Sequence, residues 1–80
     1  MVEKIKFKLP DWNKCEELVK KISTIYNIPI EERDADLMVE NQNFSLRYHP
    51  DDRKFGFISI KIYDESTGAK LKHVLKEYQN

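Results

Sequence analysis

The first residues of the chain alternate strictly between charged and apolar side chains. Lys4, Lys6 and Lys8 are separated by large apolar residues, and a period of two places successive side chains on opposite faces of a β-strand. The pattern predicts a strand over 2–9 with one dry face and one positively charged face. Pro10 follows, and the strand should end there because proline lacks the N–H that continues a ladder.

From residue 12 the apolar residues recur at the spacing of an amphipathic helix. This apolar stripe consists of Trp12, Cys15, Leu18, Val19, Ile22, Ile25 and Tyr26. Asp11 or Asn13 can cap the start, and Asn13 with Glu16 has the spacing of a capping box. The helix should end near Asn27, because Pro29 biases the residue before it away from helical backbone angles.

Strand-like alternation returns in the second half of the chain, interrupted by turn residues. The pattern predicts, in order, a charged link at 31–36, a strand at 37–40, a turn at 41–43, a strand at 44–48, a turn at 49–54, a strand at 55–63 and a helix capped within 64–67. Pro50 suits the second position of its turn. Gly68 should weaken the first turn of the last helix by up to ~1 kcal/mol.

These elements predict an α+β fold of order β-α-β-β-β-α in a single domain over 1–80. The simplest packing is a two-layer sandwich, in which both helices cover one face of a mostly antiparallel sheet. The sheet face turned to the helices would carry the apolar members of each strand, namely Ile5, Phe7, Leu9, Phe44, Leu46, Tyr48, Ile58, Ile60 and Ile62.

The opposite face of the sheet would collect cations and aromatic rings. Alternation assigns to it Lys4, Lys6, Lys8, Ser45, Arg47, His49, Phe57, Ser59, Lys61 and Tyr63. Aromatic rings among arginine and lysine are typical both of protein-binding surfaces and of open sheets that bind single-stranded nucleic acid. All of these residues except the two serines are therefore candidate binding residues.

The same face is also compatible with a surface that binds nothing. Lysines on an edge strand protect a sheet from unwanted pairing, and solvent-facing polar residues need no ligand. In addition, a shift in strand phase or a bulge at Gly56 would turn Phe57 inward. The binding hypothesis depends on whether the lysines, Arg47, Phe57 and Tyr63 share one uncovered face.

Composition limits the classes of protein to consider. The chain has 80 residues and no net charge, and its acids concentrate at 31–52; this argues against a basic duplex-coating protein but permits a local basic patch. No apolar run approaches the ~20 residues that span a bilayer, and the first residues do not resemble a signal peptide. We expect a cytoplasmic protein that binds no membrane. Its lone cysteine, Cys15, should lie in the core with Trp12.

Candidate catalytic chemistry is sparse. His49 lies beside Asp51 and Asp52, where a carboxylate could orient the imidazole as a general base, but the same residues are typical of a turn. His73 would add a second imidazole only if the fold brought it near His49. Neither glycine belongs to a phosphate-binding motif. We expect no catalytic residue, no metal and no cofactor.

From residue 11 onward, the predicted order of helix, three strands and helix is similar to the double-stranded RNA-binding fold and to the small HicA-type toxins that share it. The His-Pro-Asp segment at 49–51 and the helix start at 68–75 carry the resemblance. It implies contact with RNA, to which Lys70 and Lys72 would contribute. The catalytic histidine of the toxins would fall in the turn at 41–43, which contains none.

The sequence is compatible with three classes of function. We expect a small non-enzymatic binding module that regulates or inhibits a macromolecular partner, most readily a protein, through its exposed sheet face or an edge strand. The alternative is binding of RNA or single-stranded nucleic acid by the basic and aromatic sheet face. The third class is a small ribonuclease-like toxin that depends on His49. The pattern does not fix an oligomeric state.

Overall fold

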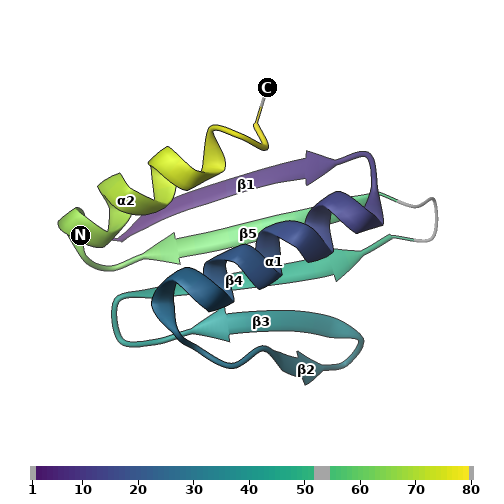
Figure 1. Ribbon diagram of the computed structural model, residues 1–80, viewed down its shortest axis with the longest axis horizontal. Coiled ribbons are helices and arrows are strands. Elements are labelled where there is room, and N and C mark those ends of the chain that lie inside the picture. Colours follow the sequence, from purple (N-terminus) through teal and green to yellow (C-terminus); the bar gives the residue numbers. More distant parts are fainter. Residues whose placement is uncertain (1, 52–54, 80) are drawn as a thin grey trace.

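The computed structural model describes residues 2–51 and 55–79. Its elements are β1 (Glu3–Leu9), α1 (Trp12–Tyr26), β2 (Glu31–Arg33), β3 (Asp36–Glu40), β4 (Phe44–Pro50), β5 (Gly56–Ile62) and α2 (Glu65–Leu75). The strands form one antiparallel sheet in the order β1-β5-β4-β3-β2 (Figure 1). β1 and β2 are therefore the two edges of the sheet.

Both helices pack on the same face of the sheet, which confirms the predicted α+β sandwich (Figure 1). The core between the two layers combines helix residues such as Leu18 and Leu71 with the apolar strand residues predicted for this face. The strand residues buried there are Leu9, Phe44, Leu46, Tyr48, Ile58, Ile60 and Ile62. Ile5 and Phe7 of β1 pack against the same core but are only partly buried.

The two ends of α1 depend on single polar side chains. Asp11 is the N-cap, and its carboxylate accepts a hydrogen bond from the Asn13 N–H at 2.8 Å. Asn13 itself lies inside the helix, so the alternative in which it caps the start with Glu16 is wrong. Asn27 ends the helix in the left-handed region at φ 54°, a conformation that asparagine adopts more readily than most residues.

The charged link predicted at 31–36 contains a strand, and this part of the prediction is wrong. β2 pairs with β3, and Arg33 lies opposite Asp36. The two residues between them, Asp34 and Ala35, have φ angles of 52° and 71°, as a type I′ hairpin turn requires. Such turns usually have glycine in the second position, where this chain has alanine. The observed order is therefore β-α-β-β-β-β-α.

The turn predicted between β3 and β4 forms around one asparagine. The Asn41 side-chain oxygen accepts hydrogen bonds from the N–H groups of Asn43 at 2.7 Å and Phe44 at 3.1 Å, which closes the hairpin. The second predicted turn, at 49–54, lies partly outside the described residues, which omit 52–54. β4 includes the first two residues of that turn and ends at Pro50.

Gly56 begins β5 in close contact with the core. A Cβ at this position would lie 2.1 Å from Cys15 Sγ and 2.6 Å from Cε1 of Tyr48, so a side chain fits only if the core moves. From Gly56 to Ile62, β5 pairs with β1 and β4 in unbroken register. No bulge interrupts this stretch, and Phe57 points to the face opposite the core.

α2 begins at a well-formed cap. The Asp64 carboxylate accepts hydrogen bonds from the Thr67 N–H at 3.0 Å and the Ser66 hydroxyl at 2.8 Å, and these bonds, that of the Thr67 N–H first, lower the pKa of Asp64. Gly68 is buried against β5, where a Cβ would lie 3.1 Å from Cγ2 of Ile62. The glycine thus weakens the helix locally but lets it lie close to the sheet.

Candidate functional site on the open sheet face

The sheet face turned away from the helices carries the candidate site. The antiparallel register aligns its residues in three rows across β1, β5 and β4, which are Lys8–Phe57–His49, Lys6–Ser59–Arg47 and Lys4–Lys61–Ser45. Every predicted binding residue except Tyr63 lies in these rows. Neither helix covers this face (Figure 1), so the lysines, Arg47 and Phe57 share the open face that the binding hypothesis requires.

Charge changes sign across the open face. The ionised side chains that β1, β5 and β4 contribute are all cations, namely Lys4, Lys6, Lys8, Lys61 and Arg47. The neighbouring β3 adds the carboxylates of Asp36 and Glu40, and Glu31 of β2 lies opposite Met38 on the same face. The β1 side of the face is therefore basic, whereas the β2 side is acidic in sum, with these three carboxylates against Arg33, which lies opposite Asp36.

The two exposed aromatic residues of the prediction do not lie together. Phe57 is 43% exposed between Lys8 and His49. Tyr63 is 47% exposed and lies just beyond the other end of β5, about 20 Å along the strand. Its N–H donates to the Asn43 carbonyl at 2.9 Å. Phe57 alone is therefore the aromatic contact available within the three rows.

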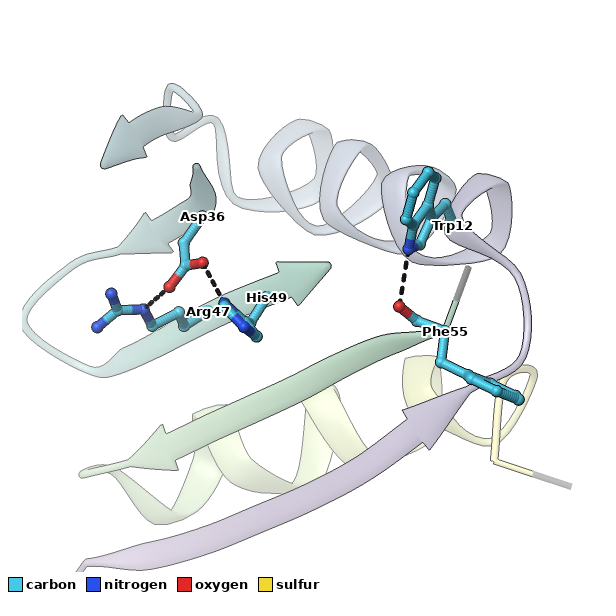
Figure 2. Close-up of polar contacts among 5 residues, drawn as sticks. All are labelled: Trp12, Asp36, Arg47, His49 and Phe55. Carbon is cyan, nitrogen blue, oxygen red and sulfur yellow. Dashed lines mark hydrogen bonds and ion pairs between the residues drawn. The ribbon is translucent and has the colours of Figure 1, made fainter. Parts of the chain in front are cut away.

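A buried carboxylate outside the predicted set of binding residues organises two members of that set. Asp36 is the first residue of β3 and is only 4% exposed, although it lies on the open face. Its Oδ1 is 2.6 Å from His49 Nδ1, and its Oδ2 accepts a hydrogen bond from Arg47 Nε (Figure 2). We call these three residues the Asp36 cluster.

The Asp36 cluster has defined donors and acceptors. Burial by itself raises the pKa of Asp36, but the hydrogen bonds from His49 and Arg47 outweigh it and leave the pKa below its ordinary value. The carboxylate is therefore ionised at neutral pH and can only accept hydrogen bonds. His49 Nδ1 must then be the donor, and His49 Nε2 is left for other contacts.

The sequence does contain a signal for this cluster, one residue outside the predicted strand. If the alternation of 37–40 is extended back by one residue, Asp36 joins Met38 on the open face. Pairing of β3 with β4 then places Asp36 near His49, since Leu37 lies opposite Tyr48 and Met38 opposite Arg47. The sequence does not indicate that the strand begins at Asp36, because the turn at Asp34 and Ala35 lacks the usual glycine.

Comparisons with protein-family models, with curated proteins and with solved structures found no match to this chain. From α1 onward the chain has β2, β3, β4 and β5 before α2, one strand more than the double-stranded RNA-binding order that its sequence resembles.

Other candidates for chemistry lie away from the open face. His73 is exposed on α2, on the helical side of the sheet, so it does not form a pair with His49. Cys15 is buried in the core as predicted; burial, with the negative charges of Asp11 and Glu16, raises its pKa to about 11, which keeps the thiol protonated and unreactive. No group of three or more potential ligands for a metal occurs among the described residues.

Trp12 is not the core residue that the helical stripe predicts. It is 37% exposed at the start of α1, and its indole N–H donates to the Phe55 carbonyl at 2.8 Å (Figure 2). The bond joins the beginning of α1 to the segment that enters β5. Within 2–51 and 55–79, no helix is long and apolar enough to cross a membrane.

A shallow pocket occurs at the other end of the sheet, remote from the Asp36 cluster. It lies between the start of α2 and the edge of β1, and its lining includes Glu3, Tyr63, Asp64 and Lys72. Lys72 Nζ and Glu3 Oε2 form an ion pair at 2.7 Å across it. Lys72 and Glu3 pair with one another, and Asp64 accepts the hydrogen bonds of the α2 cap, so these three charged groups of the pocket are already engaged.

Proposed function

We propose that this protein is a small non-enzymatic module that binds a protein partner by adding one of the partner's strands to the free edge of β1. The observation that carries the proposal is that the core-facing side chains of this strand are incompletely buried. Ile5 and Phe7 are only partly buried, whereas the residues opposite them, Ile60 and Ile58, are each 1% exposed. A strand added beside β1 would complete the core at this edge.

The backbone of β1 is suited to strand addition. It has 7 residues, and its register with β5 is unbroken. β5 occupies one side of β1, so the backbone N–H and C=O groups on its other side have no strand partner in the described sheet. The opposite edge is less suitable, since β2 has only 3 residues, all of them exposed.

The lysines of β1 define the chemistry of the partner strand. A strand paired with β1 places its own side chains beside Lys4, Lys6 and Lys8 on the open face. Acidic residues there, alternating with apolar residues on the core side, would be favoured. A second copy of β1 would instead bring lysine next to lysine, so the same row disfavours self-association.

Strand capture also explains how a module without catalytic groups would act. A partner segment held at β1 is withheld from its other contacts, which regulates or inhibits the partner without any chemical step. The lysines of β1 would select a partner strand with acidic residues. Burial of Ile5 and Phe7 under that strand would supply affinity.

Two short synthetic peptides test the proposal, one in which Glu and Val alternate and one in which Lys replaces Glu. The Glu peptide should bind and slow hydrogen exchange of β1 amides, as measured by NMR. Lys6→Glu should weaken binding of the Glu peptide about fivefold, because one favourable cross-strand pair becomes repulsive. Lys20→Glu, on the exposed side of α1, is the matched control and should leave the affinity unchanged.

Two results would contradict strand addition. One is equal binding of the two peptides, which would mean that the lysine row selects nothing. The other is a set of amide changes confined to β4 and β5, because these strands lie inside the sheet and accept no further strand.

A further inference from the structure

The Asp36 cluster is a feature that strand addition at β1 does not use. Asp36 is the one buried charged side chain among the residues that the structure describes, and it lies on the open face instead of in the core. Its side chain is 6% exposed, whereas the side chains of Arg47 and His49 are 46% and 62% exposed. The carboxylate therefore lies beneath two donor side chains that face solvent.

The hydrogen bonds to Asp36 fix these two side chains but leave their outer nitrogens free. Asp36 engages only Nε of Arg47 and Nδ1 of His49. The terminal nitrogens of Arg47 point away from Asp36 (Figure 2), and neither they nor His49 Nε2 bond to another described residue. Since the guanidinium is a rigid planar fork, holding it at Nε also orients its terminal N–H groups. Such a fork matches two oxygens of a phosphate.

Residues beside the Asp36 cluster are of the types that contact the bases and phosphates of a nucleotide chain. Phe57 lies opposite His49, and Ser59 lies opposite Arg47, at the ~5 Å spacing of neighbouring strands. Beyond them, on β1, are Lys8 and Lys6. The surface thus has an oriented guanidinium, then an exposed aromatic ring, then further cations.

The geometry points to a binding site for single-stranded nucleic acid, in which the Arg47 fork binds a phosphate, a base stacks on Phe57, and Lys6 and Lys8 neutralise neighbouring phosphates. Asp36 is a positioning residue that touches no ligand. An acidic peptide would neutralise the same cations but would leave the Phe57 ring without a stacking partner. The inference does not depend on strand addition, because it uses the open face and not the edge of β1.

Labelled oligo(dT) and oligo(U) test the site by fluorescence anisotropy with the full chain over a series of salt concentrations. The logarithm of the affinity should fall linearly with the logarithm of the salt concentration. Phe57→Ala should weaken binding at least fivefold, since one stacked base contributes about 1–3 kcal/mol, and Phe57→Tyr should retain it. Phe57 is 43% exposed, so both variants should fold.

The slope of log affinity against log salt concentration distinguishes the effect of charge from the effect of the oriented Arg47 fork. Lys6→Gln removes one phosphate contact and should reduce the slope by about 0.7, the value per contact for single strands. Arg47→Lys keeps the charge and should leave the slope unchanged while it weakens binding about tenfold, because lysine presents no planar fork. Asp36→Asn should resemble Arg47→Lys, an effect on affinity without an effect on slope. Lys76→Gln, an exposed cation after α2, is the control.

Three results would overturn this inference. The first is the absence of oligonucleotide binding. The second is binding that neither Phe57→Ala nor Arg47→Lys weakens, which would be unspecific charge attraction. The third is tighter binding of a phosphoserine peptide, or of the Glu–Val peptide, than of either oligonucleotide at the same salt concentration. Strand addition is judged separately, by the effect of Lys6→Glu on peptide binding and by exchange at β1.

Discussion

At the scale of single residues, Gly56 is where the fold leaves room for a hydrogen but not for a methyl group. Gly56→Ala should lower the free energy of unfolding by about 2–3 kcal/mol, because the new Cβ would overlap Cys15 Sγ and the Tyr48 ring and force the core apart. Urea denaturation followed by circular dichroism measures the loss.

Gly68→Ala is the matched comparison for this prediction. Its Cβ would meet only the Ile62 side chain, 3.1 Å from Cγ2, and alanine favours the helix by up to ~1 kcal/mol over glycine. The variant should therefore unfold within about 1 kcal/mol of the natural chain. A similar loss in both variants would show that the contact with Cys15 and Tyr48 is not the cause.

Single residues also show how far the sequence predicts the site. The strict alternation of lysines with apolar residues is enough to place Lys4, Lys6 and Lys8 on one face, and the same rule places Arg47 and Phe57. Asp36 escapes this reasoning, because its burial depends on two side chains from another strand. A pattern of period two assigns faces, but it does not reveal a hydrogen bond between strands.

At the scale of elements, the β2–β3 hairpin has the least favourable local sequence. Ala35 adopts a φ of 71°, which costs an L-residue with a Cβ about 1–2 kcal/mol. Ala35→Gly should therefore raise the free energy of unfolding by about 0.5–1 kcal/mol, after the greater flexibility of unfolded glycine is deducted. Thermal or urea unfolding gives the value.

The other alanine of the chain provides the control for this element. Ala69 is an exposed residue within α2, so Ala69→Gly should destabilise the protein by up to ~1 kcal/mol. We expect Ala35→Gly to raise the free energy of unfolding and Ala69→Gly to lower it. Destabilisation by Ala35→Gly would mean that the turn is not strained.

The elements that the sequence predicts well are those with long periodic runs. β1, α1 and β5 each extend over several periods, and most of their apolar residues lie in the core or against it; the exposed ones are Trp12, Ile25 and Phe57. β2 has 3 residues, exposed on both faces, so it has no apolar period to detect. β2 forms because it pairs with β3 across a turn that has no glycine. Neither the pairing nor the turn leaves a signal in the sequence of β2 itself.

At the scale of the whole molecule, the Asp36 cluster should make stability depend on pH. The pKa of Asp36 is lower in the folded protein than its ordinary value, so the stabilisation is present above the ordinary pKa and is lost as the pH falls through the lowered one. Asp36→Asn should be less stable than the natural chain at neutral pH by about 1–3 kcal/mol.

Urea denaturation of the two proteins over a pH series measures this dependence. The difference between their free energies of unfolding should narrow as the pH falls below the ordinary pKa of aspartate. Glu40→Gln, an exposed change on the same strand, should leave the natural dependence nearly intact. A gap that stays constant or widens in acid would show that the charge of Asp36 does not stabilise the fold.

The position of β1 in the sheet also affects how the protein is made. β1 is synthesised first among the strands, yet its partner β5 is the last, and Glu3 pairs with Ile62. During translation β1 has to remain unpaired until β5 has left the ribosome, and unpaired nascent strands are prone to aggregate. We expect the lysines of β1 to oppose aggregation of this segment before it pairs with β5.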